Sequence, residues 1–336
     1  MSKIITVTGE KDPAEFQMIL SHEHLLIDLR NQASERAPDR KMDAGDRSLL
    51  LRDPYALRDN LLLDSVKTAE EECGMLLQAG CNAIVDCSTP EIGRNPEKLR
   101  RLSQSANISI VMGCGYYTED THTRFFEETP EEKLAELLEA EIFCGIGGVR
   151  PGIIGEIGTS REILPGEKKA LRIAARVQRT CGLAIQVHIY PWSVNGLEAL
   201  KILEKFGVPP EKIVICHSDV APDRNYILAL LQEGVYVQFD NFGKEFTPDS
   251  GGFTAGGFVR DTERAELAAR IVQDGFGDKL LITNDICLKC MLSAFGGSGY
   301  CHIFNHILPM IAGHGIPMEY LKNHIMHDNP VTMLAV

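Results

Sequence analysis

The sequence lacks any long hydrophobic run and has few basic residues. No apolar stretch approaches the roughly 20 residues that a membrane-spanning helix needs, and the opening residues MSKIITVTGEKD do not resemble a secretory signal peptide. Lys and Arg number 34 against 47 Asp and Glu, which gives a net charge of −13. This charge argues against nucleic acid and anionic membranes as partners. A small substrate, even an anionic one, remains compatible with it, because a site can be locally positive.

The cysteines form no disulfide pattern. Ten are scattered along the chain, and several lie in apolar runs: Cys81, Cys87, Cys114 and Cys216. Buried, reduced thiols of this kind are typical of a cytoplasmic protein, which is the location that we expect. The close pair Cys287 and Cys290 has no second pair to complete a zinc knuckle, so we interpret it as structural, with a redox motif as the alternative.

Eight short apolar runs alternate with helical patterns, so the sequence predicts an α/β protein. The runs cover residues 18–24, 82–88, 108–113, 152–157, 183–189, 213–217, 235–240 and 279–285. Residues 61–78 and 167–180 are typical of the helices between them, the latter with Pro165 before it and Gly182 after it. Strands that alternate with helices form a parallel sheet. We predict a single domain over residues 1–336 with the (β/α)8 TIM-barrel fold, and an open doubly wound sheet is the alternative.

Polar residues at the ends of the runs favour the barrel, because a barrel brings all carboxyl ends of its strands to one face, where its active site lies. Two loops stand out beside this pattern. Residues 31–59 are polar and predicted to be a loop. The glycine-rich stretch 251–257 is predicted to be either a lid over the barrel mouth or a plain surface loop.

The first run ends in His22-Glu23-His24, which places two imidazoles on one face of a strand. Further potential metal ligands end later runs, so that the candidate set is His22, His24, Glu156, His188, His217 and Asp285. These six side chains are too many for one four-coordinate zinc. They fit two divalent ions about 3.5–4 Å apart.

The predicted metal ligands divide by strand. His22, His24 and Asp285 would hold one ion, His188 and His217 the other, and Glu156 would lie between them. A single histidine at a strand end is often only a hydrogen-bonded rim residue, and Asp285 alone could be a helix cap. Glu156 is harder to explain in this way, because a carboxylate almost never lies buried without a partner.

These residues and their order resemble the phosphotriesterase family of the amidohydrolase superfamily. The matching motifs are 22–24, 155–160, His188, 217–219 and 283–285. The resemblance implies a (β/α)8 barrel with two metal ions, usually zinc, held by the same six ligands. Phosphotriesterases proper bridge the metals with a carbamylated lysine. Glu156 instead resembles the phosphotriesterase homology protein branch, as do residues 237–240 and Gly243-Lys244, which argues against organophosphate triesterase activity.

The chemistry predicted from this centre is hydrolysis. A hydroxide that bridges the two metal ions would attack the substrate, and Asp285 would accept its proton as the catalytic residue. A carboxyl ester or lactone is the first candidate substrate, and an amide or phosphoester is the alternative. A non-catalytic ligand-binding protein is less favoured, because all six ligands are present. The family often forms dimers, so a homodimer is possible.

Substrate selection should come from the loops that follow the strands. Tyr116, Lys244 and Asp240 are the candidate substrate-binding residues, and Asp240 could alternatively orient a ligand histidine. For Tyr117 we favour a packing role, and for Arg264 a solvated position on its helix. Arg150 should lie at the opposite end of the barrel. The remaining paired histidines are predicted not to be ligands: His302, His306, His324 and His327.

Overall fold

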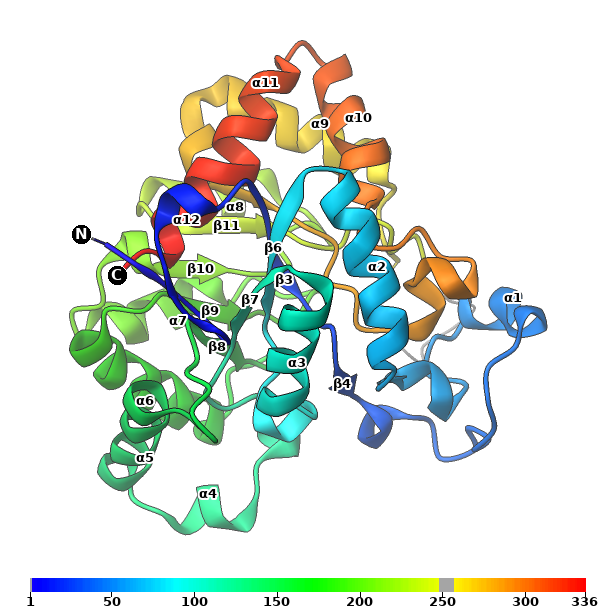
Figure 1. Ribbon diagram of the computed structural model, residues 1–336. Coiled ribbons are helices and arrows are strands. Elements are labelled where there is room, and N and C mark those ends of the chain that lie inside the picture. The colour runs from blue at the N-terminus through cyan, green and yellow to red at the C-terminus, as the bar shows by residue number, and fades with distance from the viewer. Residues whose placement is uncertain (1, 248–256) are drawn as a thin grey trace.

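The computed structural model describes residues 2–247 and 257–336, and parallel strands form its centre (Figure 1). The described strands of this centre are β3 (Met18–Glu23), β6 (Cys81–Asp86), β7 (Ser109–Met112), β8 (Ile154–Gly158), β9 (Ile185–His188), β10 (Ile213–Ile215), β11 (Tyr236–Phe239) and β12 (Leu280–Ile282). They form a five-stranded sheet in the order β12-β11-β10-β9-β8 and a three-stranded sheet in the order β3-β6-β7. Neighbouring strands in both sheets are parallel.

Hydrogen bonds join the two sheets along both of their edges. Between β7 and β8, Gly152 N donates to Met112 O at 2.9 Å and Gly155 N donates to Cys114 O at 2.6 Å. Between β12 and β3, the Thr283 hydroxyl donates to His22 O at 3.1 Å. The strands therefore close on themselves, and the predicted (β/α)8 barrel is confirmed. The open doubly wound alternative is excluded, because an open sheet has two unpaired edges.

Helices surround the strands (Figure 1). Those described are α1 (Arg47–Leu50), α2 (Val66–Gln78), α3 (Pro96–Ala106), α4 (Arg124–Glu128), α5 (Glu131–Cys144), α6 (Pro165–Cys181), α7 (Gly196–Glu204), α8 (Arg224–Gln232), α9 (Asp261–Ile271), α10 (Leu308–Gly313), α11 (Met318–Tyr320) and α12 (Asn329–Leu334). Wider π-helical turns cover Val272–Phe276, Ile303–Ile307 and Leu321–Asp328. Among the described helices, none combines the length and apolar character that a membrane span would need.

Local sequence explains where the helices begin and end. Pro165 occupies the first turn of α6, where its missing N–H costs nothing, and Gly182 ends that helix in the left-handed conformation, with φ of 73°. At the start of α2 the Ser65 side chain accepts the Thr68 N–H. The predicted loop at residues 31–59 needs a correction, because it contains α1 and the 3-10 turn Ala44–Asp46, and the 3-10 turns Arg30–Gln32 and Arg58–Leu61 overlap its ends.

The strands are apolar on both faces because they separate two packed layers. Side chains inside the barrel, such as Ile19, Val85 and Val111, form one buried cluster, and a larger cluster fills the space between strands and helices. All ten cysteines are free thiols, and seven of them are buried. Cys287 and Cys290 accordingly form no disulfide.

Two short antiparallel pairs lie outside the barrel: β1 (Ile4–Thr6) with β2 (Gly9–Lys11), and β4 (Ile27–Asp28) with β5 (Leu62–Leu63). Arg150, which precedes β8, pairs with Glu10 of β2 at 2.9 Å, so its predicted place at the amino ends of the strands is confirmed. Of the glycine-rich stretch 251–257, residues 251–256 lie outside the described part of the chain.

Candidate metal centre

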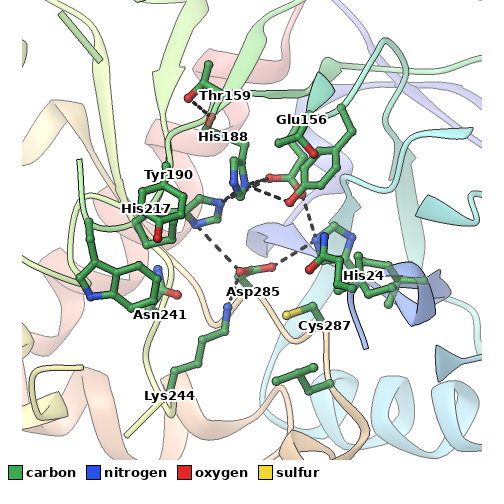
Figure 2. Close-up of a pocket in the computed structure, with 18 of the residues that line it drawn as sticks. His24, Glu156, Thr159, His188, Tyr190, His217, Asn241, Lys244, Asp285 and Cys287 are labelled. Carbon is green, nitrogen blue, oxygen red and sulfur yellow. Dashed lines mark hydrogen bonds and ion pairs between the residues drawn. The ribbon is translucent and has the colours of Figure 1, made fainter. Parts of the chain in front are cut away.

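The carboxyl ends of the strands bring all six predicted metal ligands into one cluster. His22 and Glu23 end β3, and His24 follows. Glu156 belongs to β8, and His188 ends β9. His217 and Asp285 lie just beyond β10 and β12. Figure 2 shows His24, Glu156, His188, His217 and Asp285 pointing toward one another from different strands.

Glu156 is the centre of this cluster. Its Oε2 lies 3.1 Å from His188 Nδ1, 3.4 Å from His217 Nε2 and 3.5 Å from His22 Nε2. Its Oε1 lies 3.4 Å from His24 Nε2. The two oxygens of one carboxylate therefore face imidazoles from opposite sides of the barrel, which is the arrangement that a bridging ligand needs.

Asp285 faces the histidines of the first strand. Its Oδ1 lies 3.2 Å from His24 Nε2 and 3.6 Å from His22 Nε2. One ligand atom from each of His22, His24 and Asp285 lies within 4.8 Å of the others, and so do atoms of His22, Glu156 and His217. Both sets have the nitrogen and oxygen donors that divalent cations bind.

His22 supplies an independent test of whether a cation fits. Its side chain is fully buried, and neither ring nitrogen has a hydrogen-bond partner. A buried polar nitrogen without a partner is costly. Nε2 faces the Glu156 and Asp285 carboxylates, and a cation held by these three groups would satisfy it. The residues therefore fit a metal ion.

The electrostatics of the cluster follow from burial and close pairing. Burial alone would raise the pKa of Glu156, but His22, His188 and His217 outweigh it and hold that pKa well below its usual range. Burial lowers the pKa of His22 more than the nearby carboxylates raise it. For His217 the carboxylates of Asp240 and Glu156 outweigh burial, and the pKa is raised. The centre thus concentrates ionised carboxylates among imidazoles, as a cation site requires.

Two of the predicted ligands have an unusual backbone. His217 has φ of 58° and Asp285 has φ of 49°, both in the left-handed region. Non-glycine residues rarely adopt this conformation, and those that do are concentrated at functional sites. The backbone turns sharply here, directly after the strand, and presents each side chain to the centre.

Other buried side chains orient the ligands. Asp240 Oδ1 lies 2.8 Å from His217 Nδ1, and Asp240 Oδ2 lies 3.9 Å from His22 Nδ1. Ser88 Oγ lies 2.9 Å from His24 Nδ1. Of the two roles predicted for Asp240, the structure supports the orientation of a histidine, which is His217. It is fully buried and does not line the cavity described below, so direct substrate contact was the wrong alternative.

Glu23 is a site residue that the sequence interpretation missed. Its carboxylate accepts the Thr283 hydroxyl at 2.5 Å, the Asn284 N–H at 2.8 Å and the Ile286 N–H at 2.8 Å. These donors lower the pKa of Glu23, but burial outweighs them and raises it to about 7. Glu23 ties the loop that carries Asp285 to the strand that carries His22 and His24. Its position between two candidate ligands was the available signal.

A cavity of about 410 Å³ opens onto the centre and is lined by His24, Glu156, His188, His217 and Asp285 at that end. Its volume lies in the range of small-molecule sites. Much of the remaining wall is aromatic and comes from Tyr55, Tyr117, Tyr190, Trp192, Phe246 and Phe258. Lys244 also lines the cavity, as predicted, and contacts Asp285 Oδ2 (Figure 2). Burial alone would lower the pKa of Lys244, but Asp285 outweighs it and raises that pKa.

The two adjacent tyrosines have exchanged their predicted roles. Tyr116 does not line the cavity, and its ring packs against Phe126 at 4.6 Å. Tyr117, for which packing was predicted, lines the cavity with its hydroxyl 3.3 Å from His188 Nδ1. Neighbouring residues point in different directions, and the packing of the α4 region, which the sequence does not reveal, decides which one faces inward.

Arg264 was also predicted wrongly. Its side chain is fully buried and pairs with Asp219 and Asp261, whereas the sequence interpretation placed it in solvent. The paired histidines lie outside the cluster of six predicted ligands. His302 pairs with Asp261 at 2.6 Å, and His324 and His327 both pair with Asp328 at 2.7 Å.

Comparison with known proteins identifies relatives of the whole chain. The model of the phosphotriesterase family matches residues 2–334. The N-acetyltaurine hydrolase of Tetraodon nigroviridis is 31% identical over 343 residues, which cover 99% of this chain and 98% of that protein.

Solved structures show the same fold. A resiniferatoxin-binding protein from Rhodobacter sphaeroides is 30% identical with a TM-score of 0.94, over 99% of this chain and 94% of that one. The phosphotriesterase homology protein of Escherichia coli, complexed with phosphate in its active site, is 25% identical with a TM-score of 0.80, over 96% and 100%. A mutant phosphotriesterase-like lactonase from Deinococcus radiodurans is 26% identical with a TM-score of 0.78, over 98% and 99%.

Proposed function

This chain belongs to the phosphotriesterase family of hydrolases, and from that premise we propose that it is a binuclear zinc hydrolase of a small acyl substrate. The observation that carries the proposal is the position of Glu156. Its two oxygens lie within 3.5 Å of four imidazoles from both sides of the barrel. A carboxylate in this position, beside a buried histidine without hydrogen bonds, supports the presence of a pair of cations.

In this proposal the ligands divide by strand. His22, His24 and Asp285 would hold one ion, and His188 and His217 the other. Glu156 would bind both. Imidazole and carboxylate donors without thiolate suit zinc, although other divalent ions accept the same donors.

The chemistry then depends on water and on Asp285. When bound, two divalent cations acidify a water molecule and polarise the substrate carbonyl. Asp285 would accept a proton from the attacking water and return it to the leaving group. Its Oδ1 faces the histidines, while Lys244 holds its Oδ2 and keeps the carboxylate ionised.

The cavity suggests what the substrate carries. The aromatic wall favours an apolar or planar group, and the buried cation of Lys244 favours an anionic group beside the reacting bond. Tyr117, with its hydroxyl 3.3 Å from His188, would donate a hydrogen bond to an oxygen of the substrate.

An amide is the first candidate bond. Its support is the full-length relative named N-acetyltaurine hydrolase, which hydrolyses an N-acyl compound by its name. A carboxyl ester or lactone, which the sequence analysis placed first, is the second candidate, because a relative over nearly the whole chain is a phosphotriesterase-like lactonase. The same centre could serve either bond, since both require attack on a carbonyl carbon.

The test combines metal analysis with a substrate panel. We expect about two equivalents of zinc per chain, and turnover of one class among N-acyl amino acids and sulfonates, lactones, aryl esters and phosphoesters. Glu156→Gln should lose zinc and nearly all turnover. Glu72→Gln is the matched control, because Glu72 is also buried but binds the Ser293 N–H at 2.7 Å, away from the cluster. A wild-type protein that holds no zinc, even after zinc or manganese is added, would contradict the proposal.

A further inference from the structure

Arg264 is a buried arginine near the proposed metal centre that contacts none of its predicted ligands. The Arg264 side chain, on α9, is completely shielded from solvent. Its guanidinium has three sets of partners: Nη1 lies 2.8 Å from Asp261 Oδ1, Nη2 donates to Lys244 O at 3.2 Å, and Nε donates to Asp219 O at 3.2 Å with Asp219 Oδ2 at 3.4 Å. Arg264 therefore joins the loops after β10 and β11 to the start of α9.

Asp219 carries this connection toward the centre. Its carboxylate accepts the backbone N–H of Asp240 at 3.2 Å, and it accepts both the backbone and the side-chain N–H of Asn241 at 3.0 Å. The Asn241 amide also donates to Asp240 Oδ1 at 2.7 Å. The backbone and the carboxylate of Asp240 are thus both fixed by groups that Asp219 holds.

Asp240 is the last link before the ligands. It receives the His217 N–H and lies 2.8 Å from His217 Nδ1. A carboxylate at Nδ1 keeps the proton on that nitrogen and leaves Nε2 free to bind a cation. The orientation of Asp240 therefore determines which nitrogen of His217 faces the centre.

We infer that Arg264 is a positioning residue of the metal centre, acting through Asp219 and Asp240 on His217. The inference rests on the proposed function, since it assumes that His217 binds metal. Arg264 touches none of the six ligands. It acts because one planar guanidinium reaches Asp219 and Asp261 together with a backbone carbonyl, which a lysine ammonium cannot do in the same geometry.

Two variants separate positioning from simple charge compensation. Arg264→Lys retains the positive charge beside the two buried carboxylates but loses the fork, and Arg264→Met loses both. If Arg264 served only to neutralise charge, Arg264→Lys would behave as the wild type does. Arg94→Lys is the matched control, because the Arg94 side chain is only 3% exposed and pairs with Glu141 of α5 at 2.5 Å.

The measurement is the rate at which zinc is released to a chelating dye, with the absorption spectrum of the cobalt-loaded protein as a second readout. Folding of each variant is checked by circular dichroism. We expect Arg264→Lys and Arg264→Met to release at least one zinc about tenfold faster than the wild type. Substitutions of residues that orient metal ligands weaken metal binding by a factor of this order. Their cobalt spectra should shift, while Arg94→Lys should match the wild type in both readouts.

The outcomes distinguish this inference from the proposed function. If the wild type holds two zinc ions and folded Arg264→Lys releases them at the wild-type rate with the same cobalt spectrum, the inference is overturned and the proposed function stands. A wild type that binds no zinc overturns both. Should Arg264→Met fail to fold, Arg264→Lys decides the matter alone.

Discussion

Single residues in this centre each serve more than one partner. Glu156 faces four imidazoles, and Asp240 faces two. Asp285 faces histidines with one oxygen and Lys244 with the other. A substitution at any of these positions therefore changes several contacts at once, and informative experiments compare two substrates or two variants rather than one variant with the wild type.

Lys244→Met should reduce kcat/KM for a substrate with a carboxylate or sulfonate beside the reacting bond. Loss of one charge-assisted hydrogen bond costs about 2 kcal/mol, or roughly 30-fold. The neutral analogue of the same substrate should lose far less, and steady-state kinetics on the pair measures the difference. Lys289→Met is the control, because Lys289 is also buried but pairs with Asp59 at 2.9 Å. An equal loss for both substrates would show that Lys244 acts on Asp285 and not on the substrate.

Tyr117→Phe should lower kcat/KM by a factor of about five, the value of one hydrogen bond of roughly 1 kcal/mol. Zinc content should not change, because the Tyr117 hydroxyl lies 3.3 Å from a ligand atom without being one itself. The control is Tyr116→Phe, whose ring packs on Phe126 outside the cavity and should leave the kinetics unaltered. Equal kinetics for Tyr117→Phe and the wild type would show that the Tyr117 hydroxyl takes no part in the reaction.

The clustering of the six predicted ligands could be foreseen from the sequence, because their residue types and their places at strand ends are both visible there. Exposure could not be predicted in the same way. Arg264 has an ordinary helical neighbourhood in the sequence, and its burial follows from Asp219 and Asp261, which the fold brings beside it. Tyr116 and Tyr117 are adjacent residues of the same type, so the sequence does not show which side chain faces the cavity. The packing of the α4 region decides this.

At the scale of elements, the ends of the strands were predicted within three residues, since buried parallel strands are short apolar runs with abrupt ends. The joins between strands were less visible. Where β7 passes β8, the backbones approach closely, and a Cβ on Gly113 would lie 2.2 Å from Gly155 O. Only glycine at position 113 allows this approach. The contact is made to Gly155, the residue immediately before Glu156.

Gly113→Ala should destabilise the protein by roughly 1–3 kcal/mol, the usual cost of overpacking, and should weaken zinc binding by displacing Glu156. Urea unfolding and zinc content measure the two effects. Gly74→Ala is the matched control, because Gly74 lies in α2 and a Cβ there meets nothing within 4 Å. That variant should gain about 0.5–1 kcal/mol, since alanine favours the helix. A harmless Gly113→Ala would show that the two strands can separate freely.

At the scale of the whole molecule, the centre joins elements from most of the barrel. Its ligands come from β3, β8 and β9 and from the ends of β10 and β12, so a bound cation would restrain the ring at several points. A ligand that binds only the folded state stabilises it, by about 2.7 kcal/mol at a hundredfold excess over its dissociation constant.

Removal of metal with a chelator should therefore lower the melting temperature by several degrees, and added zinc should restore it. Differential scanning calorimetry follows both steps. Glu156→Ala should melt at one temperature with or without chelator, because it has no bridging ligand to hold the ions. A wild-type melting temperature that is indifferent to chelator would mean that bound metal does not restrain the barrel.

The contacts between β3 and the loop after β12 also determine when, during synthesis, the set of predicted ligands becomes complete. His22 and His24 are synthesised before Asp285 and the loop that Glu23 secures. A nascent chain that stops before residue 285 holds only part of the ligand set. If the cluster binds metal as proposed, the complete site can therefore form only after residue 285 has been synthesised.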